Sequence, residues 1–79
     1  MINVILEEIK EILADHFEIT PGSIDGETLL VDDLGAGELD LADIAMDIED
    51  QYSVEVTEEA LEGLKTVEDI VLFIEENVD

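Results

Sequence analysis

The sequence predicts an all-α fold, a small helical bundle with three principal helices, one short helix and a long loop between the first two principal helices. Three segments repeat apolar residues at the spacing of an amphipathic helix, and typical helix-capping residues precede the later segments. The only alternating stretch, residues 52–56, has no second strand to pair with. Seventy-nine residues are typical of one domain, so we expect residues 1–79 to fold as a single unit.

The first helix is expected to run from near the N-terminus to about Glu18. Acidic residues and Lys10 occupy its opposite face, and Pro21 and Gly22 cannot continue it. Its apolar face comprises Ile2, Ile5, Leu6, Ile9, Ile12, Leu13 and Phe17. Residues 19–37 then form a loop interrupted by proline and glycine, and a loop of this length in a compact domain is often functional.

The second helix is expected over residues 38–51, after Gly37, a residue tolerated at an N-cap. Thr57 can cap a short helix that Gly63 terminates. Thr66 and Asp69 form a capping-box pattern at the start of the last helix. The second helix has an apolar stripe made of Leu41, Ile44, Ala45, Ile48 and Tyr52.

The charge balance excludes several classes of function. Two basic residues against 24 acidic ones give a net charge of −22, which repels nucleic-acid phosphates and anionic membranes. There is no cysteine, so disulfides and thiolate-bound metals are excluded. No apolar run is long enough to span a membrane, and no basic segment resembles a signal peptide. We therefore expect a soluble, cytoplasmic monomer.

The centre of the chain resembles an acyl carrier protein. Residues 27–40 read ETLLVDDLGAGELD, which is similar to the Asp-Leu-Gly-Ala-Asp-Ser-Leu-Asp motif at the start of that family's second helix. The resemblance extends over the whole chain and includes Met46, Glu49, Tyr52 and the Thr66–Asp69 segment. The resemblance implies a carrier protein of fatty-acid or polyketide synthesis. Members of that family bear 4′-phosphopantetheine on the serine of the motif.

The chain departs from the family motif at the attachment position. The family's serine aligns with Glu38, and the preceding aspartate aligns with Gly37. A carboxylate cannot replace the attacking hydroxyl, and Ser23 and Ser53 lie outside the motif, so no phosphopantetheine cofactor is expected. An engineered serine replacement would leave Gly37 unexplained, whereas a divergent natural paralogue accounts for both changes. Glu38 either completes a well-terminated helix or mimics the charge of the modified serine.

Aspartates on the second helix form the candidate partner-binding surface. They recur at i, i+3, i+7 and i+10, so they share one side of the helix. In the family this acidic helix faces basic patches on partner enzymes, although a charge run can also be simply a solvated face. The predicted partner-binding residues are Glu38, Asp40, Asp43, Asp47 and Asp50, with Asp33 and Glu49 as weaker candidates.

No metal site and no catalytic activity are expected. The calcium-loop pattern is absent, although weak divalent binding would relieve repulsion between carboxylates. His16 has no second histidine or cysteine nearby in sequence and is expected on the surface at the helix C-terminus. No carboxylate pair is distinguished by a nucleophile or an oxyanion donor.

The remaining apolar residues are expected in the core. In the family, some of the equivalent positions line an acyl-chain crevice between the second and third helices, but without an attachment serine we interpret them as core. They are Leu39, Leu41, Ile44, Ile48, Val56, Leu61, Leu64 and Ile70.

Three functions are compatible with these observations. The first is an acyl-carrier-like protein that is not phosphopantetheinylated and binds a basic partner through its acidic second helix. The second is a carrier of fatty-acid or polyketide synthesis, present as a disabled variant or loaded at an unexpected residue. The third is an anionic mimic of nucleic acid, which would display carboxylates at phosphate-like spacing along one face.

Overall fold

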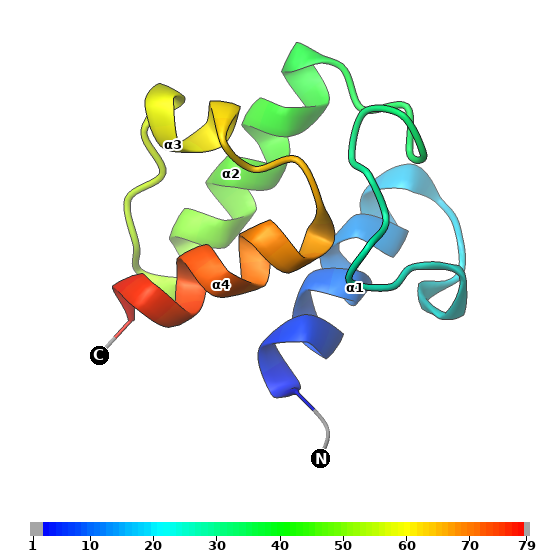
Figure 1. The fold of residues 1–79 in the computed structure, drawn as a ribbon, viewed down its shortest axis with the longest axis horizontal. Coiled ribbons are helices and arrows are strands. Elements are labelled where there is room, and N and C mark those ends of the chain that lie inside the picture. The colour runs from blue at the N-terminus through cyan, green and yellow to red at the C-terminus, as the bar shows by residue number, and fades with distance from the viewer. Residues whose placement is uncertain (1–2, 79) are drawn as a thin grey trace.

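A computed structural model describes residues 3–78 and confirms the all-helical fold (Figure 1). Among the described residues there is no β-strand, only one isolated antiparallel bridge between Leu29 and Thr66. A 3-10 turn, which the sequence pattern did not predict, follows the first helix. The elements are α1 Val4–Phe17, η1 Pro21–Ser23, α2 Glu38–Tyr52, α3 Glu58–Glu62 and α4 Val67–Asn77.

Helix α1 is terminated by local side-chain and backbone geometry at both ends. Asn3 is its N-cap, and the Asn3 side-chain oxygen accepts a hydrogen bond from the Leu6 N–H at 3.2 Å. Glu18 ends the helix in the left-handed conformation with φ 57°. The predicted end at Glu18 is therefore confirmed, whereas the predicted contribution of Ile2 lies outside the described residues.

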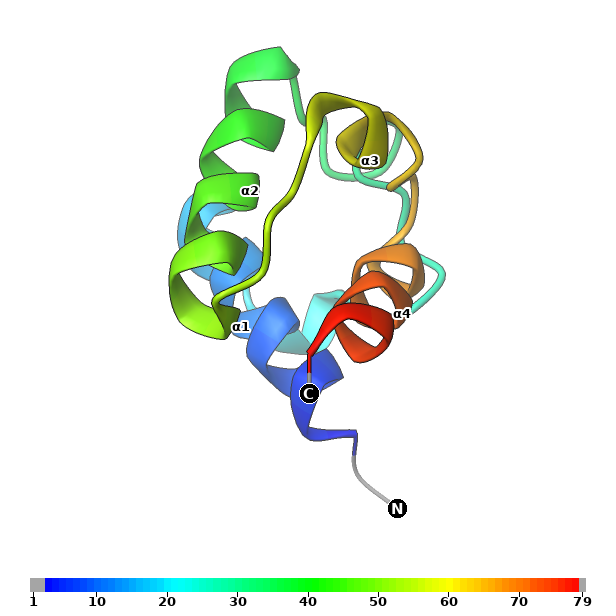
Figure 2. The ribbon, with the colours of Figure 1, turned by 90° about the vertical axis from the view of Figure 1, so that its left-hand side faces the viewer.

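The hydrophobic core lies where α1 meets α2 and α4 (Figure 2). Helix α1 makes its most extensive contacts with α4 and less extensive contacts with α2 and η1. Ile9 and Leu13 of α1 and Ile74 of α4 are fully buried, as is Ile48 of α2. Burial of such side chains is the main favourable contribution to folding.

The long loop between α1 and α2 is attached to the start of α4. The Leu30 N–H donates to the Lys65 carbonyl at 3.0 Å, and the Val67 N–H donates to the Thr28 carbonyl at 3.1 Å. Ile24 and Leu30 from this loop are buried in the core. The loop thus fixes the position from which α2 begins.

One predicted core residue is on the surface. Leu39 is 82% exposed, whereas Ile44 and Ile48 on the same helix are buried. The reason is angular: successive α-helical residues are rotated by about 100°, so Leu39 lies about 200° from Leu41 and projects away from the bundle. Of the other predicted core residues, Leu64 and Ile70 are buried as well, and Leu41, Val56 and Leu61 are partly buried.

Candidate functional site

The start of α2 places Glu38 at its first helical position. Gly35 adopts φ +71°, a left-handed conformation that favours glycine, and Gly37 is the N-cap. The Asp40 Oδ2 atom accepts a hydrogen bond from the Gly37 N–H at 2.9 Å. This hydrogen bond is the main reason why the pKa of Asp40 lies below its usual value, and a second hydrogen bond, with His16, lowers that pKa further. Glu38 is exposed at the positive end of the helix dipole.

Asp40 also joins α2 to α1. His16 lies in the last turn of α1. The Asp40 Oδ1 atom lies 2.8 Å from the His16 Nε2 atom. The His16 side chain is only 22% exposed, and its ring packs edge-on against Phe17. His16 is therefore a half-buried link between helices, not the surface residue that the sequence predicted. Asp40, a predicted partner-binding residue, is occupied by intramolecular contacts.

The other three predicted aspartates share one exposed surface, which we call the outer face of α2. Asp43, Asp47 and Asp50 are exposed there. Leu39 and Met46 lie on the same side by helical spacing and are 82% and 64% exposed. The sequence interpretation did not assign these two residues to the surface, although their spacing of seven places them on one face. The outer face thus combines negative charge with exposed apolar side chains.

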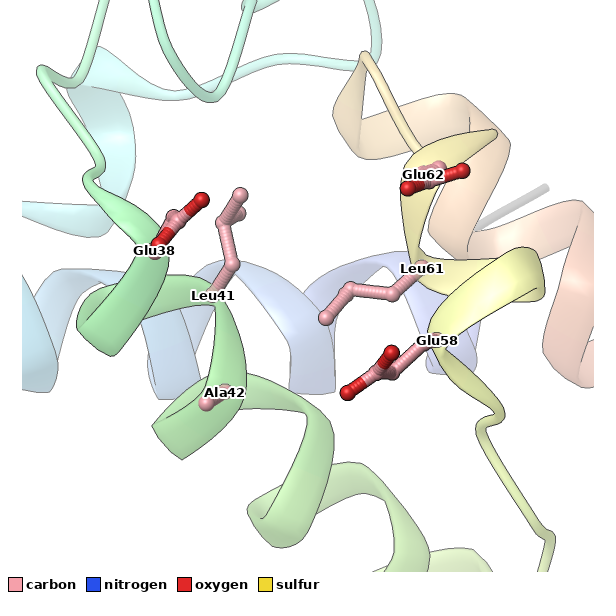
Figure 3. A pocket seen from close by; sticks show the side chains of 6 residues that line it. All are labelled: Glu38, Leu41, Ala42, Glu58, Leu61 and Glu62. Atoms are coloured by element: carbon pink, nitrogen blue, oxygen red, sulfur yellow. The ribbon is translucent and has the colours of Figure 1, made fainter.

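Glu38 lies on a different side of α2, beside a groove between α2 and α3. The groove has a volume of about 450 Å³. Figure 3 shows Leu61 and Glu58 of α3 pointing toward α2, with Glu38 and Leu41 on the opposite wall. The lining residues are Glu38, Leu41, Ala42, Glu58, Leu61 and Glu62. The structure therefore does not bring Glu38 together with the aspartates of the outer face.

The two weaker candidates have structural contacts. The Glu49 Oε2 atom accepts a hydrogen bond from the Val56 N–H at 2.8 Å, which holds the segment that leads to α3. The Asp33 Oδ2 atom accepts a hydrogen bond from the Leu29 N–H at 2.8 Å in the long loop. Both carboxylates therefore shape the chain on either side of α2.

The first position of α2 carries a carboxylate and no hydroxyl, so it does not fit a phosphodiester-linked prosthetic group. Ser23 lies in η1, where its hydroxyl donates to the Thr20 carbonyl at 2.7 Å. Ser53 is the C-cap of α2, at the opposite end of that helix from Glu38. Neither serine stands at the start of α2.

The described residues contain no group of three or more histidine, cysteine or acidic residues placed to hold a metal ion. None of the helices in residues 3–78 is both long and apolar enough to span a membrane.

Comparison with known proteins identifies the family. Residues 7–74 match the family model described as "Phosphopantetheine attachment site". The chain is 37% identical to an acyl carrier protein of Clostridium perfringens over 73 residues, which cover 92% of this chain and 96% of the relative. It is 38% identical to an acyl carrier protein of Thermotoga maritima over 74 residues, covering 94% and 91%.

A solved structure agrees with these sequence matches. The acyl carrier protein from Enterococcus faecalis superposes with a TM-score of 0.80 at 26% identity, covering 92% of each chain. The fold is thus shared over almost the whole domain. The chain belongs to the acyl carrier protein family.

Proposed function

We propose that this protein is an acyl carrier protein homologue that is not phosphopantetheinylated and that binds a basic partner protein through the outer face of α2. The family model concerns phosphopantetheine attachment, and in our alignment of residues 27–40 with the family motif the serine position corresponds to Glu38. In this proposal the protein catalyses no reaction of its own. It acts as a cytoplasmic monomer in fatty-acid or polyketide synthesis, as a regulatory or structural subunit.

The observation that carries the proposal is the composition of the outer face. Asp43, Asp47 and Asp50 are exposed, and Leu39 and Met46 expose apolar surface among them. Complementary charge accelerates association with a basic surface, while buried apolar groups slow dissociation. Neither the disabled carrier nor the nucleic-acid mimic is favoured by a particular contact in the structure, and both stay predictions.

The first experiment tests the absence of the prosthetic group. The purified protein is incubated with a broad-specificity phosphopantetheinyl transferase and coenzyme A, and its intact mass is measured. We expect no increase in mass. An increase by one phosphopantetheine group would contradict the proposal, and peptide mapping of Ser23 and Ser53 would then locate the attachment.

A gain-of-function variant is the matched control for that experiment. Replacing Gly37→Asp and Glu38→Ser together restores the family's Asp-Ser-Leu-Asp sequence at the start of α2. We expect this double variant to acquire one phosphopantetheine group. A folded double variant that stays unmodified would show that the transferase no longer recognises other parts of the surface.

A second experiment tests binding through the outer face. An enzyme that binds acyl carrier proteins is titrated with the protein, and with the variant Asp43→Lys, Asp47→Lys. We expect affinity to fall by about tenfold or more. The control variant Glu75→Lys, Glu76→Lys changes net charge equally at exposed positions of α4 and should retain its affinity within about twofold. Equal losses for both variants would indicate unspecific charge attraction.

A further inference from the structure

Met46 carries the single sulfur atom within residues 3–78, and it stands on the outer face of α2. The chain has no cysteine, and its other methionine, Met1, lies outside the described residues. Met46 is 64% exposed. It lines an open hollow of about 470 Å³, whose other lining residues are Asp47, Glu49 and Asp50. A thioether so exposed is reachable by a small oxidant such as hydrogen peroxide, which converts methionine into its sulfoxide.

Oxidation at this position is compatible with the fold. Met46 takes no part in the hydrophobic core, whereas its neighbours Ile44 and Ile48 are buried there. A methionine sulfoxide disrupts a core because it turns a flexible apolar side chain into a polar one. At Met46 the added oxygen would be hydrated by solvent, so the helix should stay intact.

The sulfoxide would change the polarity of the outer face without changing its charge. Its oxygen is a polar hydrogen-bond acceptor with no net charge, so the negative charge of the neighbouring aspartates stays as it is. Asp43 and Asp50 lie three and four residues from Met46 and adjoin it on the helix surface. When a partner covers Met46, the sulfoxide oxygen loses its hydration, which costs free energy unless the partner supplies a donor. Oxidation thus removes an apolar contact and leaves the electrostatic attraction in place.

We propose that Met46 is a site of peroxide oxidation that weakens the binding of a partner protein to the outer face of α2. The sulfur lone pair attacks one peroxide oxygen, the O–O bond breaks, and the other oxygen leaves as water. The sulfur is oxidised by two electrons and the peroxide is reduced. A methionine sulfoxide reductase reverses the step with two thiols, which become a disulfide while the sulfoxide oxygen leaves as water. This inference rests on the proposed function, because it needs a partner that covers the outer face.

The site of oxidation is tested on the folded protein. The purified protein is treated with hydrogen peroxide, the peroxide is removed, and intact mass and peptide mapping locate the added oxygen. Because Met46 is exposed, we expect its oxidation rate to lie within about threefold of that of Nα-acetyl-methionine methylamide. Oxidation of Met46 that is slower than the model compound by about tenfold or more would overturn the proposal.

The stability of the oxidised protein shows whether oxidation acts on the surface or through the fold. We expect the melting temperature to change by less than about 3 °C, because substitutions at exposed positions have small effects on stability. A larger fall in melting temperature would show that oxidation unfolds the helix, and it would overturn the proposal.

The effect on binding is tested with the same enzyme that tests the outer face, itself not treated with peroxide. Association and dissociation rates are measured by surface plasmon resonance for the untreated and the oxidised protein. We expect dissociation to accelerate by about tenfold and the association rate to change by less than about twofold, because charge governs association and buried contacts govern dissociation. Treatment with a methionine sulfoxide reductase should restore the slower dissociation. Equal dissociation rates for the two forms would overturn the proposal.

Two variants at the same position are the matched controls. Met46→Leu keeps an apolar side chain of similar volume but has no sulfur, so peroxide treatment should leave the dissociation rate of this variant unchanged. A peroxide effect on Met46→Leu would place the responsible group elsewhere in the chain and would overturn the proposal. Met46→Gln introduces an uncharged polar group without any oxidant and should dissociate faster than the untreated protein, as the sulfoxide does. A glutamine variant that dissociates as slowly as the untreated protein would contradict polarity as the cause.

Failure of this inference is distinguishable from failure of the proposed function. If the untreated protein does not bind the enzyme, the proposed function is contradicted, and this inference is overturned with it. If the untreated protein binds and oxidation of Met46 leaves the dissociation rate unchanged, only this inference is overturned.

Discussion

The α1–α4 side and the α2–α3 side of the molecule are built differently. Ile9 and Leu13 of α1 pack with Val67 and Ile74 of α4, and all four side chains have 0% exposure. Helix α3, by contrast, buries none of its residues, and α2 buries Ile44, Ala45 and Ile48 on its inner face but leaves Leu39 82% exposed. Helices α2 and α3 contain no basic residue at all.

This difference separates stability from recognition. Fully buried aliphatic side chains contribute most of the free energy of folding, so the α1–α4 side can hold the domain together. The α2–α3 side can then display apolar groups and like charges that cost stability but are available to a partner or ligand.

The largest effect is expected from a cavity in the α1–α4 core. Ile9→Ala removes fully buried methylene and methyl groups and should lower the free energy of unfolding by about 3 kcal/mol. Leu61→Ala, at the edge of the open groove, should cost only about 1 kcal/mol, since water and neighbouring side chains can fill the space. Urea unfolding of both variants gives the comparison. Equal costs would show that the α2–α3 side contributes as much stability as the core.

Salt should stabilise the protein and should do so most on the α2–α3 side. Like-charge pairs at helical spacing cost about 0.2–0.5 kcal/mol each, and screening by sodium chloride or Mg²⁺ removes part of that cost. We therefore expect the free energy of unfolding to rise by about 1 kcal/mol, with the largest gain in amide-exchange protection in α2 and α3. A melting temperature that does not respond to either salt would contradict this expectation.

One of the two side-chain contacts between the sides, the Tyr52–Glu8 hydrogen bond, should contribute about 1 kcal/mol to the free energy of unfolding. The Tyr52 hydroxyl donates to the Glu8 Oε1 atom at 2.6 Å and joins the end of α2 to α1. Burial is the main cause of the raised pKa of Tyr52, and this hydrogen bond raises the pKa further. The contribution is therefore complete below about pH 10 and is lost as pH rises through the folded-state pKa. Tyr52→Phe should remove it, and Glu8→Gln serves as the second variant of a double-mutant cycle.

The smallest change in the free energy of unfolding is expected for Asp69 and Asp40, the acidic residues that cap α4 and α2. Its dependence on pH distinguishes it from the other effects. Asp69 accepts hydrogen bonds from the N–H groups of Thr66 and Lys65 at 3.1 and 3.0 Å. Both hydrogen bonds lower the pKa of Asp69, and the one from Thr66 lowers it most. The contribution of the Asp69 carboxylate to stability is present above its unfolded-state pKa of about 3.9, and it is lost as pH falls through the folded-state pKa.

The difference in unfolding free energy between the native protein and Asp69→Asn should therefore be constant near neutral pH and shrink in acid. Comparing the two proteins at each pH cancels the general relief of charge repulsion that acid also brings. Asp40→Asn should show the same trend at the start of α2. A difference that does not change with pH would show that neither carboxylate stabilises its helix through its charge.

Local patterns in the sequence determined the helices and their ends. Apolar residues at helical spacing, Gly37 before α2, Thr57 before α3 and the Thr66–Asp69 capping box all act between residues a few positions apart. The resemblance at residues 27–40 also predicted the family, and the matches to acyl carrier proteins confirm it.

Only the tertiary structure decided which side chains meet across the fold. The His16–Asp40 and Glu8–Tyr52 pairs join residues 24 and 44 positions apart, and no local rule specifies such contacts. The groove likewise combines Glu38 with Glu58 and Glu62 from another helix, and it places Glu38 away from the outer face. Periodicity defines the faces of each helix, but the packing of α1, α2 and α4 determines which of those faces are buried and which remain available for binding.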